Sequence, residues 1–113
     1  TLPQLVGPAR ARGLAMLAEP LDAETAADWG MIWRAVDDME LMDEATALAT
    51  RLAHGPTAGL ALAKQAILAA TENSLEDQLA LEAKLQSKAG ATADYREGVT
   101  AFLEKRPAKF TGK

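Results

Sequence analysis

The stretch "LAHGPTAGLALAKQAILAATENSLEDQLALEAKLQ", residues 52–86, decides the fold because it encodes two successive helices. Gly55 and Pro56 mark the first boundary, since glycine often follows the end of one helix and proline suits the start of the next. After this boundary, residues recur every three or four positions, which is the spacing that places side chains on one face of a helix. These residues are Leu60, Ala63, Ile67 and Thr71. The pattern predicts a helix that starts just after Pro56.

The second helix of this stretch has its own start signal. Ser74 stands three residues before Asp77, which resembles a capping box with aspartate in place of the usual glutamate. The apolar residues that follow are Leu75, Leu79, Leu81 and Leu85. Gly90 then predicts the end of the helix.

The flanking segments extend the helical reading in both directions. On the N-terminal side, apolar residues from Leu41 to Leu52 keep a helical rhythm that starts at Glu40 and ends at His54. On the C-terminal side, a last helix is expected to start at Thr92 or Asp94 and to end at Pro107. Its apolar stripe is Tyr95, Val99, Phe102 and Leu103.

The N-terminal third is less regular. A helix is predicted within residues 8–20, and a shorter one starts at the N-cap Asp22 and stops at Gly30. Residues 31–36, "MIWRAV", form the one segment that could be a strand or simply extended chain. Trp29 and Trp33 are expected in the core, although an aromatic wall for an acyl group is the alternative. The soft boundary between the two parts lies at residues 37–40.

Composition restricts the class of protein. The 113 residues include no cysteine, which excludes a disulfide framework and a thiolate metal site and is consistent with a reducing cytosol. No apolar run reaches the length of a membrane span, and no signal peptide is recognisable, so we expect a cytoplasmic protein without a membrane partner. No basic face with interleaved aromatic residues indicates a nucleic-acid partner.

Few residues are candidates for catalysis. His54 is the single histidine and lies beside a predicted helix end, where the helix dipole favours its charged form, so a structural role is the simpler interpretation. The acidic pairs at residues 37–38 and 43–44 are neighbours in sequence and do not face one another on a helix. We therefore predict no catalytic residue and no metal site in this chain.

The C-terminal end differs from the rest in charge. Residues 96–113 contain five cations and two anions, although the whole chain carries a formal net charge of −4. Lys105, Arg106 and Lys109 cluster around the last turn of the predicted helix, where cations complement the helix dipole. The alternative is a ligand site in which a purine ring stacks on Phe102 and a phosphate lies near Lys105.

Three stretches carry a resemblance to a known family. "TLPQLVGPARARGLAMLAEPLDAETAADWGMIWRAVDD" resembles the segment that follows the active-site acid in the crotonase (enoyl-CoA hydratase/isomerase) superfamily. "YREGVTAFLEKRPAKFTG" resembles the C-terminal signature of the same superfamily, and residues 52–86 match in order and spacing. Within it, "WGMIWRAVDD" and "DYREGVTAFLEKR" are most similar to the ring-epoxyphenylacetyl-CoA isomerases of phenylacetate degradation.

The resemblance implies an all-α segment, the C-terminal helical part of a crotonase/ClpP-like fold, without its β-rich spiral core. Residues 1–39 would be the tail of that core, and residues 40–113 a helical oligomerisation region. The parent would process an acyl-CoA substrate without a covalently bound cofactor, through oxyanion-hole and acidic groups that precede Thr1. The chain alone should therefore be inactive.

The resemblance also implies a role for the last helix. In this superfamily the terminal helices join subunits into trimers, often paired into hexamers, and the last helix approaches the coenzyme A of a neighbouring subunit. By motif position, Phe102 would lie near the adenine and Lys105 near a phosphate. A general enoyl-CoA hydratase is the alternative within the family, and a stand-alone helical interaction domain is the alternative outside it.

Overall fold

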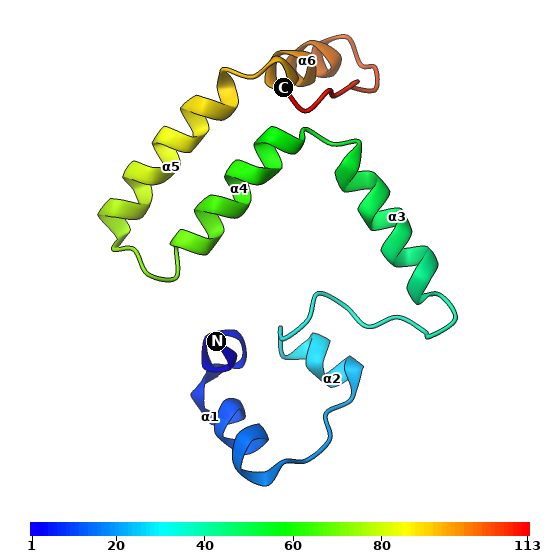
Figure 1. The fold of residues 1–113 in the computed structure, drawn as a ribbon, viewed down its shortest axis with the longest axis vertical. Coiled ribbons are helices and arrows are strands. Elements are labelled where there is room, and N and C mark those ends of the chain that lie inside the picture. Colours follow the sequence, from blue (N-terminus) through cyan, green and yellow to red (C-terminus); the bar gives the residue numbers. More distant parts are fainter. The chain divides into compact units, whose positions relative to one another are not determined.

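The computed structural model describes all residues from Thr1 to Lys113 and contains helices but no strand (Figure 1). The all-α prediction is confirmed. The helices are α1 (Leu2–Leu17), α2 (Ala23–Asp28), α3 (Leu41–Ala53), α4 (Thr57–Ala69), α5 (Leu75–Gly90) and α6 (Ala93–Leu103). The chain divides into two compact units, Thr1–Asp43 and Glu44–Lys113. None of the helices combines the length and the apolar character that crossing a bilayer requires.

In the N-terminal unit, α1 is interrupted at Gly7, whose φ of 79° is in the region that favours glycine. Pro8 then starts the regular part of the helix, as the sequence predicts, but the turn before it was not predicted. α2 begins at the expected cap, because the Thr25 amide donates to Asp22 Oδ1 at 2.7 Å. It stops at Gly30, whose φ is 74°.

Of the two alternatives for residues 31–36, a strand or extended chain, the strand is wrong. The amides of Met31 and Ile32 donate to the Ala26 carbonyl at 2.9 and 3.4 Å, so the start of this segment completes the end of α2. The rest is irregular, because no neighbouring strand pairs with it. The core role expected for Trp33 is also wrong, since this residue is 88% exposed. Trp29 is half-buried, with the Arg10 guanidinium 4.8 Å from its ring centroid.

The C-terminal unit is built on α4 and α5, which lie side by side and are joined by a short turn (Figure 1). Ser74 caps α5 by accepting from the Asp77 amide at 3.1 Å, as predicted. The buried Gln78 ties the helices together, since its Nε2 donates to the Ala66 carbonyl at 3.1 Å. Leu85, which is also on α5, is buried as well. The packed pair α4 and α5 supports α6, which contacts α5.

The last helix begins at its predicted cap but ends earlier than predicted. Thr92 Oγ1 accepts from the Tyr95 amide at 3.0 Å. The C-terminal end is at Leu103, and Pro107 does not stop the helix. Lys105 instead adopts a left-handed conformation with φ 54°. The Lys105 and Arg106 amides donate to carbonyls inside α6 at 3.2 and 3.0 Å, which is a Schellman turn.

Candidate functional site

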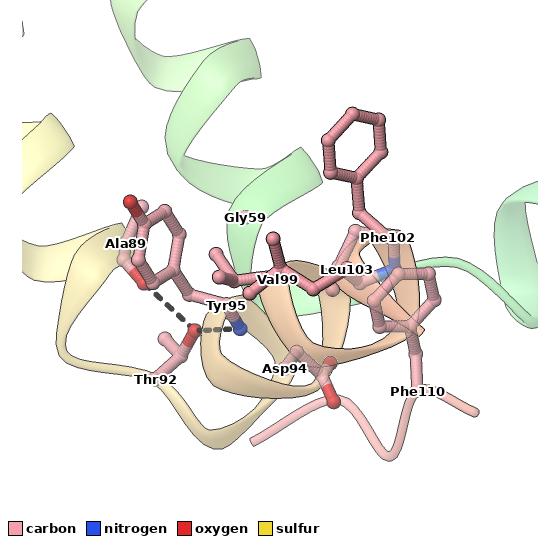
Figure 2. Close-up of a pocket in the computed structure, with 11 residues that line it drawn as sticks. Gly59, Ala89, Thr92, Asp94, Tyr95, Val99, Phe102, Leu103 and Phe110 are labelled. Carbon is pink, nitrogen blue, oxygen red and sulfur yellow. Dashed lines mark hydrogen bonds between the residues drawn. The ribbon is translucent and has the colours of Figure 1, made fainter. Parts of the chain in front are cut away.

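A pocket of about 420 Å³ lies beside α6 in the C-terminal unit (Figure 2). α6 contributes one wall, the start of α4 a second, and the C-terminal tail, residues 104–113, adds Phe110 to the lining. The lining residues are mostly apolar: Pro56, Gly59, Ala89, Thr92, Asp94, Tyr95, Gly98, Val99, Phe102, Leu103 and Phe110. Such a surface can hold an apolar or aromatic group but offers little for polar recognition.

The end of the tail is fixed by Asp94, which is only 2% exposed. Its carboxylate oxygens accept from the Thr111 amide at 2.7 Å and from the Gly112 amide at 2.8 Å. The Asp94 amide in turn donates to the Lys113 carbonyl at 2.9 Å. Asp94 is therefore a tail anchor, and its oxygens are already occupied.

The middle of the tail is fixed by Glu97, one helical turn further along α6. Its carboxylate accepts from Arg106 Nη1 at 2.6 Å, from Arg106 Nη2 at 3.0 Å and from the Lys109 amide at 2.8 Å. The Arg106 guanidinium, with the Lys109 amide, lowers the pKa of Glu97 to about 2. The pairing with Glu97 and Glu104 raises the pKa of Arg106.

The tail also fits the helices sterically. Phe110 packs on Gly98, where an added Cβ would lie 3.6 Å from the Phe110 ring. Gly112 approaches the start of α4 so closely that a Cβ there would lie 2.6 Å from Thr57 Oγ1. Gly112 also has a φ of 80°, so both its conformation and its surroundings favour glycine.

The predicted site residues lie at the edge of this arrangement. Phe102 lines the pocket, yet it is 82% exposed (Figure 2). Lys105 is in the Schellman turn that follows, and the structure shows no hydrogen bond or ion pair for its ammonium group or for that of Lys109. The two residues of the predicted site are thus near each other in sequence and accessible, whereas their contact with a ligand stays a prediction.

The interpretation of Lys105, Arg106 and Lys109 as cations in the last helical turn is wrong. The last turn of α6 contains no basic residue, because the helix ends before them. Arg106 is engaged by Glu97 and Glu104, at 2.6 Å from each. The free cationic groups after α6 are therefore lysines.

Sequence reasoning missed the anchoring role of Asp94, Glu97 and Phe110. The partners of each carboxylate lie nine or more residues away on a segment without regular structure, so no helical periodicity connects them. The one available signal is the three-residue spacing of the two acids, which places them on the same side of α6.

The other candidates from the sequence do not form a site. His54 is exposed, and its Nδ1 lies 2.8 Å from the Thr50 carbonyl oxygen. Asp37 and Asp38 are on or near the surface of the irregular segment that follows α2. No group of three or more histidine, aspartate and glutamate side chains is arranged to hold a metal ion.

Comparison with known proteins identifies the family. The family model for enoyl-CoA hydratase/isomerase matches residues 1–113. The chain is 57% identical to the 1,2-epoxyphenylacetyl-CoA isomerase of Escherichia coli over 99% of its own length and 43% of the relative's. It is 53% identical to a protein from Rhodobacter capsulatus described as "Probable enoyl-CoA hydratase", over 99% of its own length and 44% of the relative's.

Solved structures agree with this result. A crystal structure of an enoyl-CoA hydratase/isomerase-type protein from Mycobacterium abscessus superposes with a TM-score of 0.94 at 38% identity, covering 99% of this chain and 43% of that one. The enoyl-CoA hydratase of Bacillus anthracis gives 0.91 at 29% identity, with 99% and 43% coverage. The chain thus spans about two-fifths of the length of these relatives. It belongs to the enoyl-CoA hydratase/isomerase family.

Proposed function

We propose that this chain is the C-terminal part of an enzyme that converts ring-1,2-epoxyphenylacetyl-CoA to the seven-membered oxepin-CoA in phenylacetate catabolism. The 57% identity to the E. coli 1,2-epoxyphenylacetyl-CoA isomerase supports this assignment. A general enoyl-CoA hydratase is the second candidate, and the R. capsulatus relative at 53% identity supports it.

One observation carries the proposal of a coenzyme A site. A large aromatic side chain, Phe102, is 82% exposed three residues before Lys105, a cation without a partner. An exposed phenyl ring is unfavourable in water, but it can stack on an adenine ring. A lysine next to it can pair with a phosphate. The substrate's nucleotide tail would use both groups, and no covalently bound cofactor is needed.

The exposed apolar faces of the C-terminal unit support assembly as a homotrimer or hexamer. Ile67 is 70% exposed and Leu103 is 73% exposed, and Leu52 and Leu60 line a second, largely apolar groove of about 660 Å³ on α3 and α4. Burying one such side chain contributes roughly 1.5–3 kcal/mol. We assign residues 40–113 to oligomerisation and residues 1–39 to the tail of the catalytic core. The match of the family model to residues 1–113 favours this assignment over a stand-alone interaction domain.

The proposed division of labour leaves the chemistry outside this chain. In the parent enzyme, backbone amides would hold the thioester carbonyl and stabilise an enolate-like intermediate, while carboxylates would move protons. The one acid that lines the pocket beside α6, Asp94, has its carboxylate occupied by the tail amides. The chain would therefore bind and assemble, and we propose that its enzyme works in the cytoplasm.

The test is an activity assay on the protein encoded by the full open reading frame. That protein should isomerise ring-1,2-epoxyphenylacetyl-CoA, whereas the 113-residue chain alone should show no turnover. Efficient hydration of crotonyl-CoA without isomerisation would favour the second candidate. Turnover by the isolated chain would contradict the proposal. So would an isolated chain that is a monomer in sedimentation and unfolds cooperatively in calorimetry.

A single variant tests the coenzyme A site. In the full-length protein, Lys105→Ala should weaken coenzyme A binding by roughly 5- to 30-fold, because a charge-assisted contact with phosphate contributes about 1–2 kcal/mol. Lys84→Ala is the matched control, since Lys84 is an exposed lysine on α5. Equal affinities of the two variants in calorimetry at low salt would remove Lys105 from the site.

A further inference from the structure

The strongest unexplained feature is the number of bonds that end on one carboxylate. Glu97 accepts two bonds from the Arg106 guanidinium and one from the Lys109 backbone amide. Arg106 Nε donates to Glu104 at 2.6 Å, and Arg106 Nη1 also donates to the Pro107 carbonyl at 3.1 Å. The chain from Glu104 to Lys109 is therefore closed into a loop around Glu97.

The loop contains two lysines, Lys105 and Lys109, whose ammonium groups make no hydrogen bond. Lys105 lies on one side of Arg106, and Lys109 is the residue whose amide Glu97 holds. The side chain of Glu97 makes no hydrogen bond to either ammonium group, since its bonded partners are the Arg106 side chain and the Lys109 backbone. Besides its charge attraction for Lys109, Glu97 therefore acts on the lysines by fixing the path of the backbone that carries them.

We propose that Glu97 is a positioning residue for anion binding: its three-bond closure of the 104–109 loop holds the Lys105 and Lys109 backbone in place for the coenzyme A phosphates. This inference rests on the proposed function. It assigns Glu97 no contact with the ligand. It also assigns Arg106 to the loop rather than to the ligand, because all three of its guanidinium nitrogens already have protein partners.

The sign of the effect separates positioning from simple electrostatics. Glu97→Ala removes a negative charge from the neighbourhood of a polyanion site, so charge alone predicts tighter coenzyme A binding. Loss of the loop closure predicts weaker binding, because the lysines must then be ordered when the ligand binds. Glu104→Ala is the matched control, since it removes the same charge and one Arg106 contact but leaves both Glu97 bonds and the Lys109 bond intact.

The experiment is calorimetric titration of the full-length protein with coenzyme A. Glu97→Ala should weaken binding at least threefold, while Glu104→Ala should leave it unchanged or tighter. In the Lys105→Ala background, the effect of Glu97→Ala should shrink, because the two residues act through one site. Glu97→Gln keeps one acceptor oxygen and should recover part of the affinity, and it serves as the second variant if the alanine variant does not fold.

Several outcomes would overturn the inference. Unchanged or tighter binding by both Glu97 variants would show that loop closure does not matter for the ligand. An undiminished effect in the Lys105→Ala background would show that Glu97 acts elsewhere. If Lys105→Ala alone has no effect while Glu97→Ala weakens binding, the proposed Lys105 contact fails and the positioning of Lys105 fails with it. If Lys105→Ala weakens binding and Glu97→Ala does not, this inference alone fails.

Discussion

Removing the Asp94 carboxylate should release the end of the tail from α6. Asp94 is 2% exposed and accepts two short amide bonds, at 2.7 Å from Thr111 and 2.8 Å from Gly112. Hydrogen bonds to a charged group contribute about 1.5–3 kcal/mol each, and two bonds to one carboxylate are not fully additive. We therefore expect Asp94→Ala to lower the free energy of opening the tail by about 2–4 kcal/mol.

Amide hydrogen exchange measures this opening directly. A change of this size corresponds to exchange that is roughly 30- to 1,000-fold faster at Thr111 and Gly112 in the full-length protein. Asp94→Asn should also accelerate exchange, because its amide group offers one acceptor oxygen and presents a donor to the other backbone amide. Glu76→Ala is the control, since Glu76 is an exposed acid in the first turn of α5.

The result that refutes this reasoning is specific. If Asp94→Ala leaves exchange at Thr111 and Gly112 unchanged, while the Lys113 region stays ordered, the carboxylate does not anchor the tail. Faster exchange throughout α5 and α6 would instead mean global destabilisation, and comparison of the Leu85 amide with the tail amides distinguishes the two cases.

Three further predictions concern the same region. The Glu97 pKa is depressed from 4.5 to about 2, so its contribution to tail order is fully present above about pH 4.5 and is lost as the pH falls toward 2. Protection of the Lys109 amide from hydrogen exchange should decrease over this pH range in the wild type but not in Glu97→Gln. Lys105→Gly should raise the free energy of unfolding by about 0.5–1 kcal/mol, because glycine adopts the left-handed conformation without strain. The same variant should weaken coenzyme A binding, because it removes the lysine charge. A lower melting temperature would contradict the assigned φ. Gly112→Ala should destabilise the tail by about 1–3 kcal/mol, because of both its φ and its contact with Thr57. Adding Thr57→Ala to this variant should recover the steric part, whereas Gly98→Ala should be tolerated. Chemical denaturation of the wild type, the two single glycine variants and the double variant checks these expectations.

The elements that the sequence predicted correctly are those with local causes. Asp22, Ser74 and Thr92 each accept a hydrogen bond from an amide three residues later, so a few neighbouring residues suffice to place the helix start. Gly30 ends α2 because it adopts a positive φ at little cost. The family resemblance was likewise contained in the residues themselves, and the family comparison confirms it.

The failures have non-local causes. The sequence left residues 31–36 open between a strand and extended chain, because a strand needs a partner and no local pattern shows whether one is adjacent. The last helix ends before a left-handed Lys105 rather than at Pro107. The next residue, Arg106, then pairs with Glu97 on α6. A lysine in this conformation cannot be recognised from propensity, because glycine is the residue that usually occupies it.

The amino-acid sequence by itself determined the helical class, most helix starts and the membership of the family, since caps, periodicity and motif residues act over one or two turns. Only the tertiary structure decided that Arg106 is engaged within the protein, that the ammonium groups of Lys105 and Lys109 make no hydrogen bond, and that two acids on α6 hold the tail. The physical reason is that these bonds join residues 9 to 18 positions apart across an irregular segment, whose path depends on packing rather than on local preference.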